Sequence, residues 1–93
     1  MNKSDLIEHV ATLEDVASKA AAGRVVDALF DKVAGTLASG EEVAIAGIGT
    51  FHVVARQARE GRNPKTGEAL QIPAKNVPKF RAGKKLKDAV NEQ

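Results

Sequence analysis

The chain has 93 residues with 43% hydrophobic and 28% charged residues, a net charge of +2 and no cysteine. This length indicates one domain, the hydrophobic fraction excludes a disordered chain, and the lack of cysteine excludes disulfides and thiolate chemistry. No apolar run is long enough for a membrane span and no signal-peptide core is present, so we expect a soluble cytoplasmic protein with no membrane partner.

The charge is divided unevenly along the chain. Residues 1–50 contain four Lys or Arg against eight Asp or Glu, whereas residues 51–93 contain ten against four. Such asymmetry indicates a polyanionic partner for one side of the molecule, although ordinary surface charge is an alternative. With only three aromatic residues the core is light, so oligomerisation is an expected source of stability.

The N-terminal part predicts a helical hairpin. Asn2 and Asp5 form a capping-box-like start for a helix over Lys3 to Leu13, and Ser18 caps a longer second helix that Gly40 ends. The second helix has an apolar stripe wider than one small sheet requires. Its members are Val25, Val26, Leu29, Phe30, Val33, Ala34 and Leu37.

From Val43 the apolar period changes to two. The segment VAIAGIGTFHVV predicts a strand, a tight turn at Gly47–Gly49 and a second strand that continues into a basic arm. The arm turns at NPKTG and returns over Glu68 to Arg81. Because Pro73 and Pro78 in the return strand cannot donate ladder hydrogen bonds, we expect an edge or interrupted strand. A short basic helix over Ala82 to Asn91 follows.

The residues argue against an enzyme. His9 and His52 lie on different elements without cysteine, so no metal site is predicted. The GIGT segment lacks the further residues of a phosphate-binding loop and is interpreted as a turn. The serines have no evident His and Asp partners for nucleophilic catalysis. We therefore expect no catalytic residues, no cofactor and no small-molecule substrate.

The arm, RQAREGRNPKTGEALQIP, has the composition of a segment that binds nucleic acid. It lacks an evident apolar face, and strand alternation places Arg56 and Arg62 on one face and Arg59 on the other. Arginine suits the narrow, electronegative minor groove of DNA. An exposed ring such as Pro64 at the tip can wedge between base pairs and kink the duplex. The alternative is a solvated hairpin in which proline only favours the turn.

The segments MNKSDLIEHVA, GIGTF, GRNPKTGE, NVPKF and GKKLKDAV, in this order, resemble the HU/IHF family of bacterial histone-like DNA-binding proteins. The resemblance covers nearly the whole chain. HU and IHF are themselves established examples of architectural proteins that bind the minor groove. The resemblance, most specific to HU, implies an α+β fold with a helical hairpin, an antiparallel sheet, a long β-ribbon arm and a short C-terminal helix, assembled as an intertwined dimer.

The resemblance also implies a domain plan and a set of DNA-binding residues. The single domain would span 1–93, with the helical hairpin over 1–40, the sheet over 41–81, the arm over about 56–75 and the C-terminal helix over 82–93. Gly47, Gly49, Phe51 and Phe80 match structural positions. The predicted DNA-binding residues are Lys3, Arg56, Arg59, Arg62, Asn63, Pro64, Lys65, Lys75, Lys79, Lys84, Lys85 and Lys87.

The resemblance implies a bacterial, nucleoid-associated homodimer. Its function would be to bind the minor groove and phosphate backbone of double-stranded DNA with little sequence specificity. It would bend and compact the DNA by proline intercalation. Three alternatives stay open: a site-specific bender of the IHF type, a heterodimer with a paralogue, and a module whose basic arm docks an acidic protein. Two features depart from the family pattern, namely Ile48, where the family commonly has Phe, and the acidic seven-residue link TLEDVAS between the helices.

Overall fold

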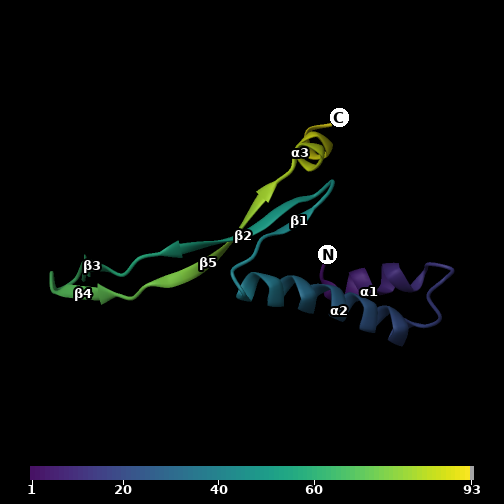
Figure 1. Cartoon of the computed structure of the whole chain (residues 1–93), viewed down its shortest axis with the longest axis horizontal. Coiled ribbons are helices and arrows are strands. Elements are labelled where there is room, and N and C mark those ends of the chain that lie inside the picture. Colours follow the sequence, from purple (N-terminus) through teal and green to yellow (C-terminus); the bar gives the residue numbers. More distant parts are fainter. Residues whose placement is uncertain (93) are drawn as a thin grey trace.

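The computed structural model describes residues 1–92 and has an α+β architecture, as predicted. Two helices come first, then a sheet whose strands extend into a ribbon, then a third helix (Figure 1). The elements are α1 (Lys3–Ala11), α2 (Lys19–Ala38), β1 (Val43–Ile45), β2 (Gly49–Arg56), β3 (Arg59–Arg62), β4 (Ala69–Ile72), β5 (Lys75–Ala82) and α3 (Lys84–Asn91). The segment predicted over 82–93 includes Gln93, which lies outside the described residues.

The helical hairpin begins with the predicted capping box. The Asp5 amide donates to Asn2 Oδ1 at 3.0 Å, and the Asn2 amide donates to Asp5 Oδ2 at 2.8 Å. Helix α1 ends at Ala11, two residues before the predicted Leu13, because the Thr12 and Leu13 amides turn back to the carbonyls three residues earlier. Ser18 caps α2 as predicted by accepting a hydrogen bond from the Ala21 amide at 3.1 Å.

The three-stranded sheet has the order β1-β2-β5, with both pairs antiparallel. The turn between β1 and β2 uses positive φ at Gly47, +84°. At Gly49 a Cβ would overlap the Arg81 carbonyl oxygen, so glycine permits the close approach of β2 and β5. Pro78 lies on β5, an edge strand of this sheet, where its missing donor is tolerated as expected.

The ribbon continues the β2–β5 pair outward. β3 and β4 form a separate two-stranded sheet, and the return strand is interrupted at Pro73 and Ala74 as predicted. The register nevertheless continues without a bulge, since Arg56 lies opposite Lys75 and Arg59 lies opposite Ile72. The ribbon therefore keeps one continuous register but has fewer ladder hydrogen bonds near Pro73 and Ala74.

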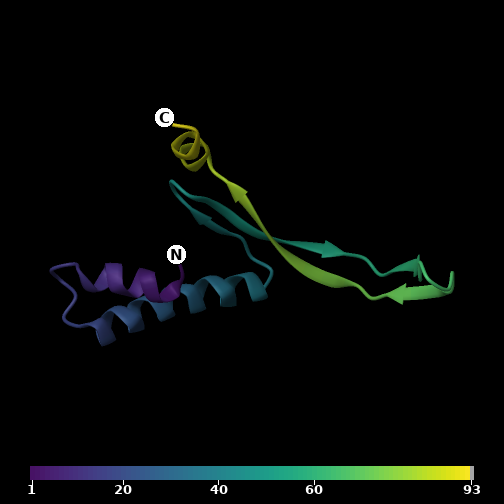
Figure 2. The ribbon, with the colours of Figure 1, turned by 180° about the vertical axis from the view of Figure 1, so that it is seen from behind.

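The described chain is extended and has almost no core of its own. Its Cα radius of gyration is 19.3 Å, against about 12 Å for a compact domain of this length. Ala22 and Val26 are its only buried hydrophobic residues within 1–92. Both views of the ribbon show the helical hairpin to one side and the arm projecting away from it (Figures 1 and 2). No helix within the described residues is both long and apolar enough to cross a membrane.

Candidate nucleic-acid interface

The strand register sorts the side chains of the ribbon onto two faces. Along both β2–β5 and β3–β4, even-numbered residues of the outgoing strand lie opposite odd-numbered residues of the returning strand. Directly opposed residues share a face and successive residues alternate. One face, called here the cationic face, carries Thr50, His52, Val54, Arg56, Glu60 and Arg62 from the outgoing strands and Ala69, Gln71, Lys75, Val77, Lys79 and Arg81 from the returning strands.

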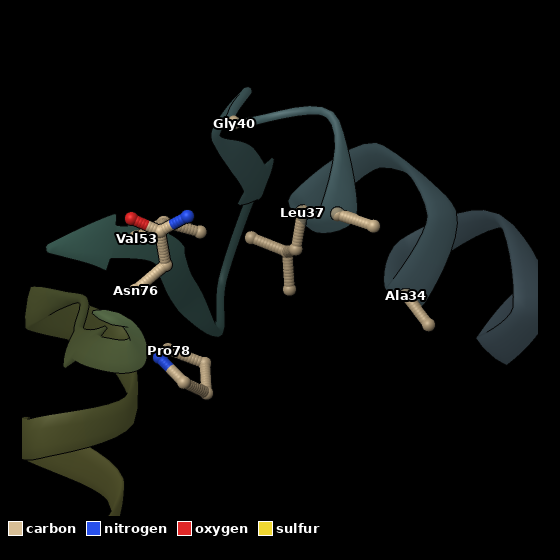
Figure 3. A pocket seen from close by; sticks show the side chains of 7 residues that line it. Ala34, Leu37, Gly40, Val53, Asn76 and Pro78 are labelled. Carbon is tan, nitrogen blue, oxygen red and sulfur yellow. The ribbon is translucent and has the colours of Figure 1, made fainter. Parts of the chain in front are cut away.

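The opposite face is apolar where it meets the helical hairpin. Phe51 and Phe80 are directly opposed, with ring centroids 4.8 Å apart. Val53 and Pro78 line one side of an open hollow of about 400 Å³, and Leu37 and its neighbours at the end of α2 line the other side (Figure 3). This apolar face is directed towards α2, so the cationic face is directed away from α2.

One prediction about the arm is confirmed by this arrangement and another is corrected. The register places Arg56 and Arg62 on the cationic face and Arg59 on the opposite face, as strand alternation predicted, and Arg59 is the one cation of the paired strands on that opposite face. The prediction that the arm lacks an apolar face is wrong, because a small apolar face is present. Leu70 is opposed to Gly61, and a Cβ at Gly61 would lie 2.8 Å from Ile72 Cδ1, so the isoleucine side chain covers the glycine.

Like charges are opposed at one level of the cationic face, where Arg56 lies directly opposite Lys75. Like charges at directly opposed positions destabilise a sheet, because their Cβ atoms are about 5 Å apart. The ion pairs within residues 1–92 join Lys3 to Asp27, Lys19 to Glu8 and Lys84 to Asp88, so none of them neutralises the cationic face. A polyanion bound there would relieve the repulsion.

The arm tip is a hydrogen-bonded turn that presents Pro64 to solvent. The Gly67 amide donates to the Asn63 carbonyl at 2.7 Å, and the Lys65 amide donates to Asn63 Oδ1 at 2.9 Å. Gly67 adopts φ +74°, as predicted from its place in the turn. The Asn63 side chain therefore holds the turn together, and its amide oxygen is already engaged in the free chain. Pro64 and Lys65 are exposed.

Some of the cations predicted to bind DNA from the body are held in ion pairs, and others are exposed. Lys3 Nζ lies 2.8 Å from Asp27 Oδ1, and this hydrogen bond with the attraction of the carboxylate raises the pKa of Lys3 above 10.5. Lys84 is similarly engaged by Asp88 at 2.6 Å. Lys85 and Lys87 are exposed on α3, beyond the end of the sheet opposite the arm. Lys3 lies on the helical hairpin, away from the cationic face.

Sequence reasoning did not include Arg81 or His52 in the predicted site, although both lie on the cationic face. Arg81 is two residues beyond Lys79 on β5, so strand alternation along β5 would have found it. His52 was considered only as a metal ligand, and no cluster of metal-binding side chains is found among the described residues. Its Nδ1 is buried without a hydrogen-bond partner in the described chain.

A family model for bacterial DNA-binding proteins matches residues 1–91. The chain belongs to this bacterial DNA-binding protein family. It is 57% identical over 91 residues to DNA-binding protein HU-beta of Salmonella typhimurium, covering 98% of this chain and 100% of that protein. Identity to DNA-binding protein HU of Staphylococcus aureus is 53% over 90 residues, covering 97% and 99%.

Solved structures of HU proteins share the fold. An Anabaena HU–DNA cocrystal structure is 41% identical with a TM-score of 0.81, covering 97% of each chain. HU from Thermotoga maritima is 32% identical with a TM-score of 0.65, covering 97% of this chain and 98% of that one. The predicted family and fold class are thereby confirmed, and the chain is an HU-type architectural DNA-binding protein rather than an enzyme.

Proposed function

We propose that the chain is a single DNA-binding domain that forms a homodimer, binds the minor groove of duplex DNA with little sequence preference, and bends the duplex with Pro64. The observation that carries the proposal is the cationic face, which runs without a register change from the sheet into the arm. Cations spaced along one side of a ribbon suit the regularly spaced phosphates of a duplex backbone. The similarity to a DNA-bound HU supports the same partner.

The homodimer is supported by the apolar surface that the single chain leaves uncovered. Leu29 and Phe30 on α2 are 55% and 43% exposed, and Phe80 on the sheet is 44% exposed. The chain has 7739 Å² of accessible surface, whereas a compact monomer of this mass exposes about 5,200 Å². A second copy that covers the α2 stripe would supply the missing core, although part of the excess belongs to the arm.

Within this dimer the arms follow the minor groove. Arg56, Arg62 and Lys75 contact the phosphate walls from the cationic face, Arg59 reaches from the other face, and Asn63 and Lys65 lie beside the intercalating Pro64. Lys79 continues the contact onto the body. Lys3, Lys84, Lys85 and Lys87 neutralise flanking phosphates, which for Lys3 and Lys84 requires release from Asp27 and Asp88. Such a protein would reside on the nucleoid in the bacterial cytoplasm.

Pro64 is proposed as a wedge because its ring is exposed at the end of a turn that other residues already hold. The hydrogen bonds from Gly67 to Asn63 and from Asn63 to Glu68 close the turn without it. Unstacking one base step at a kink costs a few kcal/mol. An exposed apolar ring that inserts into the opened step offsets part of this cost, because its contacts with the bases replace the lost stacking.

The test is DNA bending measured by end-to-end energy transfer on a labelled duplex of about 35 base pairs. Pro64→Leu should retain much of the bending, Pro64→Ala should lose most of it, and Pro64→Asp should lose it entirely. Pro73→Ala is the matched control, because Pro73 is an exposed arm proline away from the tip and should leave bending unchanged.

Binding to straight duplex should weaken much less than bending in Pro64→Ala, because the cations still supply the electrostatic affinity. Equal bending by the three Pro64 variants would show that Pro64 is a turn residue only. Binding without any bending by the wild type would favour a docking role over an architectural one.

A further inference from the structure

The cationic face carries a single carboxylate, and its position is specific. Glu60 on β3 lies directly opposite Gln71 on β4, and Arg62 is the next residue on the same face of the strand. No ion pair within residues 1–92 involves Glu60. An exposed carboxylate that neither neutralises an arginine nor caps a helix reduces the attraction of this face for phosphates. The same carboxylate gives this face a charged hydrogen-bond acceptor, which the lysines and arginines around it cannot provide.

The floor of the minor groove offers one donor to such an acceptor. A·T and T·A pairs present only the acceptors adenine N3 and thymine O2, whereas a G·C pair adds the 2-amino group of guanine. A carboxylate facing the groove floor is thus repelled by A·T pairs and can accept a hydrogen bond from guanine. Gln71, at the same level of the ribbon, can donate to the neighbouring cytosine O2 or accept from the amino group.

We propose that Glu60, supported by Gln71, senses the guanine 2-amino group in the minor groove and shifts the binding preference of the arm away from A-tracts towards G·C-containing DNA. This inference rests on the proposed function, because it requires the cationic face of the arm to enter the minor groove. A-tracts have a narrow groove with an enhanced negative potential, which attracts the arginines but repels Glu60. The carboxylate therefore moderates a preference that Arg56 and Arg62 alone would create.

The 2-amino group can be tested alone with base analogues. Inosine in place of guanine removes this group and leaves the major-groove pattern of the pair, whereas 2,6-diaminopurine in place of adenine adds it to an A·T pair. We would measure the affinity of the full-length protein for duplexes that differ only in these bases. Because the analogues also change the stiffness of the duplex, the decisive quantity is how each affinity ratio differs between wild type and variant, as in a double-mutant cycle.

The variants are Glu60→Ala and the matched control Glu68→Ala. Glu68 is also an exposed arm carboxylate, but its backbone pairs with Asn63, which the register places on the other face. The ratio of G·C to inosine·C affinity should fall about three- to tenfold from wild type to Glu60→Ala, the range of one hydrogen bond. Glu68→Ala should leave this ratio unchanged, and diaminopurine should raise the affinity of the wild type but not of Glu60→Ala.

Each outcome separates this inference from the proposed function. A ratio that is the same in wild type and Glu60→Ala would overturn the inference while DNA binding stands. A ratio that falls equally in Glu68→Ala would overturn it as well, because the effect would then be general arm charge. If no duplex were bound by the wild type, the proposed function would fail and the inference with it.

Discussion

Lys79 offers a direct measurement of whether the cationic face of the body contacts the DNA backbone. It is exposed on β5, lies opposite His52, and has no carboxylate partner among the described ion pairs. The Lys79→Gln change removes the charge and keeps a long polar side chain on the same face. Because Lys79 is exposed and takes part in none of the described ion pairs, we expect the stability of the folded protein to change little.

The magnitude follows from counterion release. Each neutralised phosphate contributes about −0.9 to the slope of log affinity against log salt, so two Lys79 side chains in a dimer contribute about −1.8. Between about 50 and 200 mM salt the wild type should then lose roughly tenfold more affinity than Lys79→Gln. The two proteins should differ most at low salt and converge as salt rises. The loss should be similar for duplexes of different sequence, because a phosphate contact carries no base information.

The assay is a fluorescence titration of a short duplex at several salt concentrations. Lys32→Gln is the matched control, because Lys32 is an exposed lysine of α2 that does not belong to the cationic face. Its salt slope should equal that of the wild type. Equal slopes for all three proteins would refute the proposal that the cationic face extends the DNA contact beyond the arm.

Three further predictions concern the body and its assembly. If the α2 stripe is a dimer interface, tenfold dilution should lower the apparent stability by about 1.4 kcal/mol, and an unfolding midpoint independent of concentration would exclude an obligate dimer. Gly49→Ala should destabilise the fold by more than about 1 kcal/mol, which thermal melting would measure. The reason is that Gly49 has φ +156° and that a Cβ there would lie 2.8 Å from Phe80 Cζ. Asp27→Asn should change stability little, since the ion pair of Asp27 with Lys3 is exposed. Because the change frees Lys3, it should raise DNA affinity and steepen the salt dependence of that affinity. An unchanged salt slope would place Lys3 outside the interface.

The features predictable from sequence are those that depend on a few neighbouring residues. The caps at Asn2 and Ser18 follow from side chains that reach amides three residues away. The turn glycines Gly47 and Gly67 follow from the conformational freedom that their turns require. The interruption at Pro73 follows from its missing donor. The wide apolar stripe of α2 follows from helical periodicity, and the structure leaves Leu29 and Phe30 within it exposed.

The two faces of the ribbon could not be predicted from one strand. Alternation along β2 and β3 places Arg59 opposite to Arg56 and Arg62, which suggests cations on both faces. The return strand decides which of the two faces carries most of the cations. The tip turn fixes a register in which odd-numbered residues of β5 share the face of even-numbered residues of β2, so Lys75 and Lys79 join Arg56. This parity depends on turn length and pairing across the ribbon, which local patterns do not contain.

The weak core and the charged ribbon have a common physical consequence. The single chain leaves Leu29 and Phe30 largely uncovered and opposes Arg56 to Lys75, so both apolar exposure and electrostatic repulsion disfavour the isolated fold. Covering the apolar surface requires a second chain, whereas relieving the repulsion requires a polyanion. Adding carboxylates to the ribbon would remove the repulsion but would also remove the attraction for phosphates. The same residues that lower the stability of the free ribbon therefore give it its affinity, which is expected wherever like charges are gathered to bind an opposite charge.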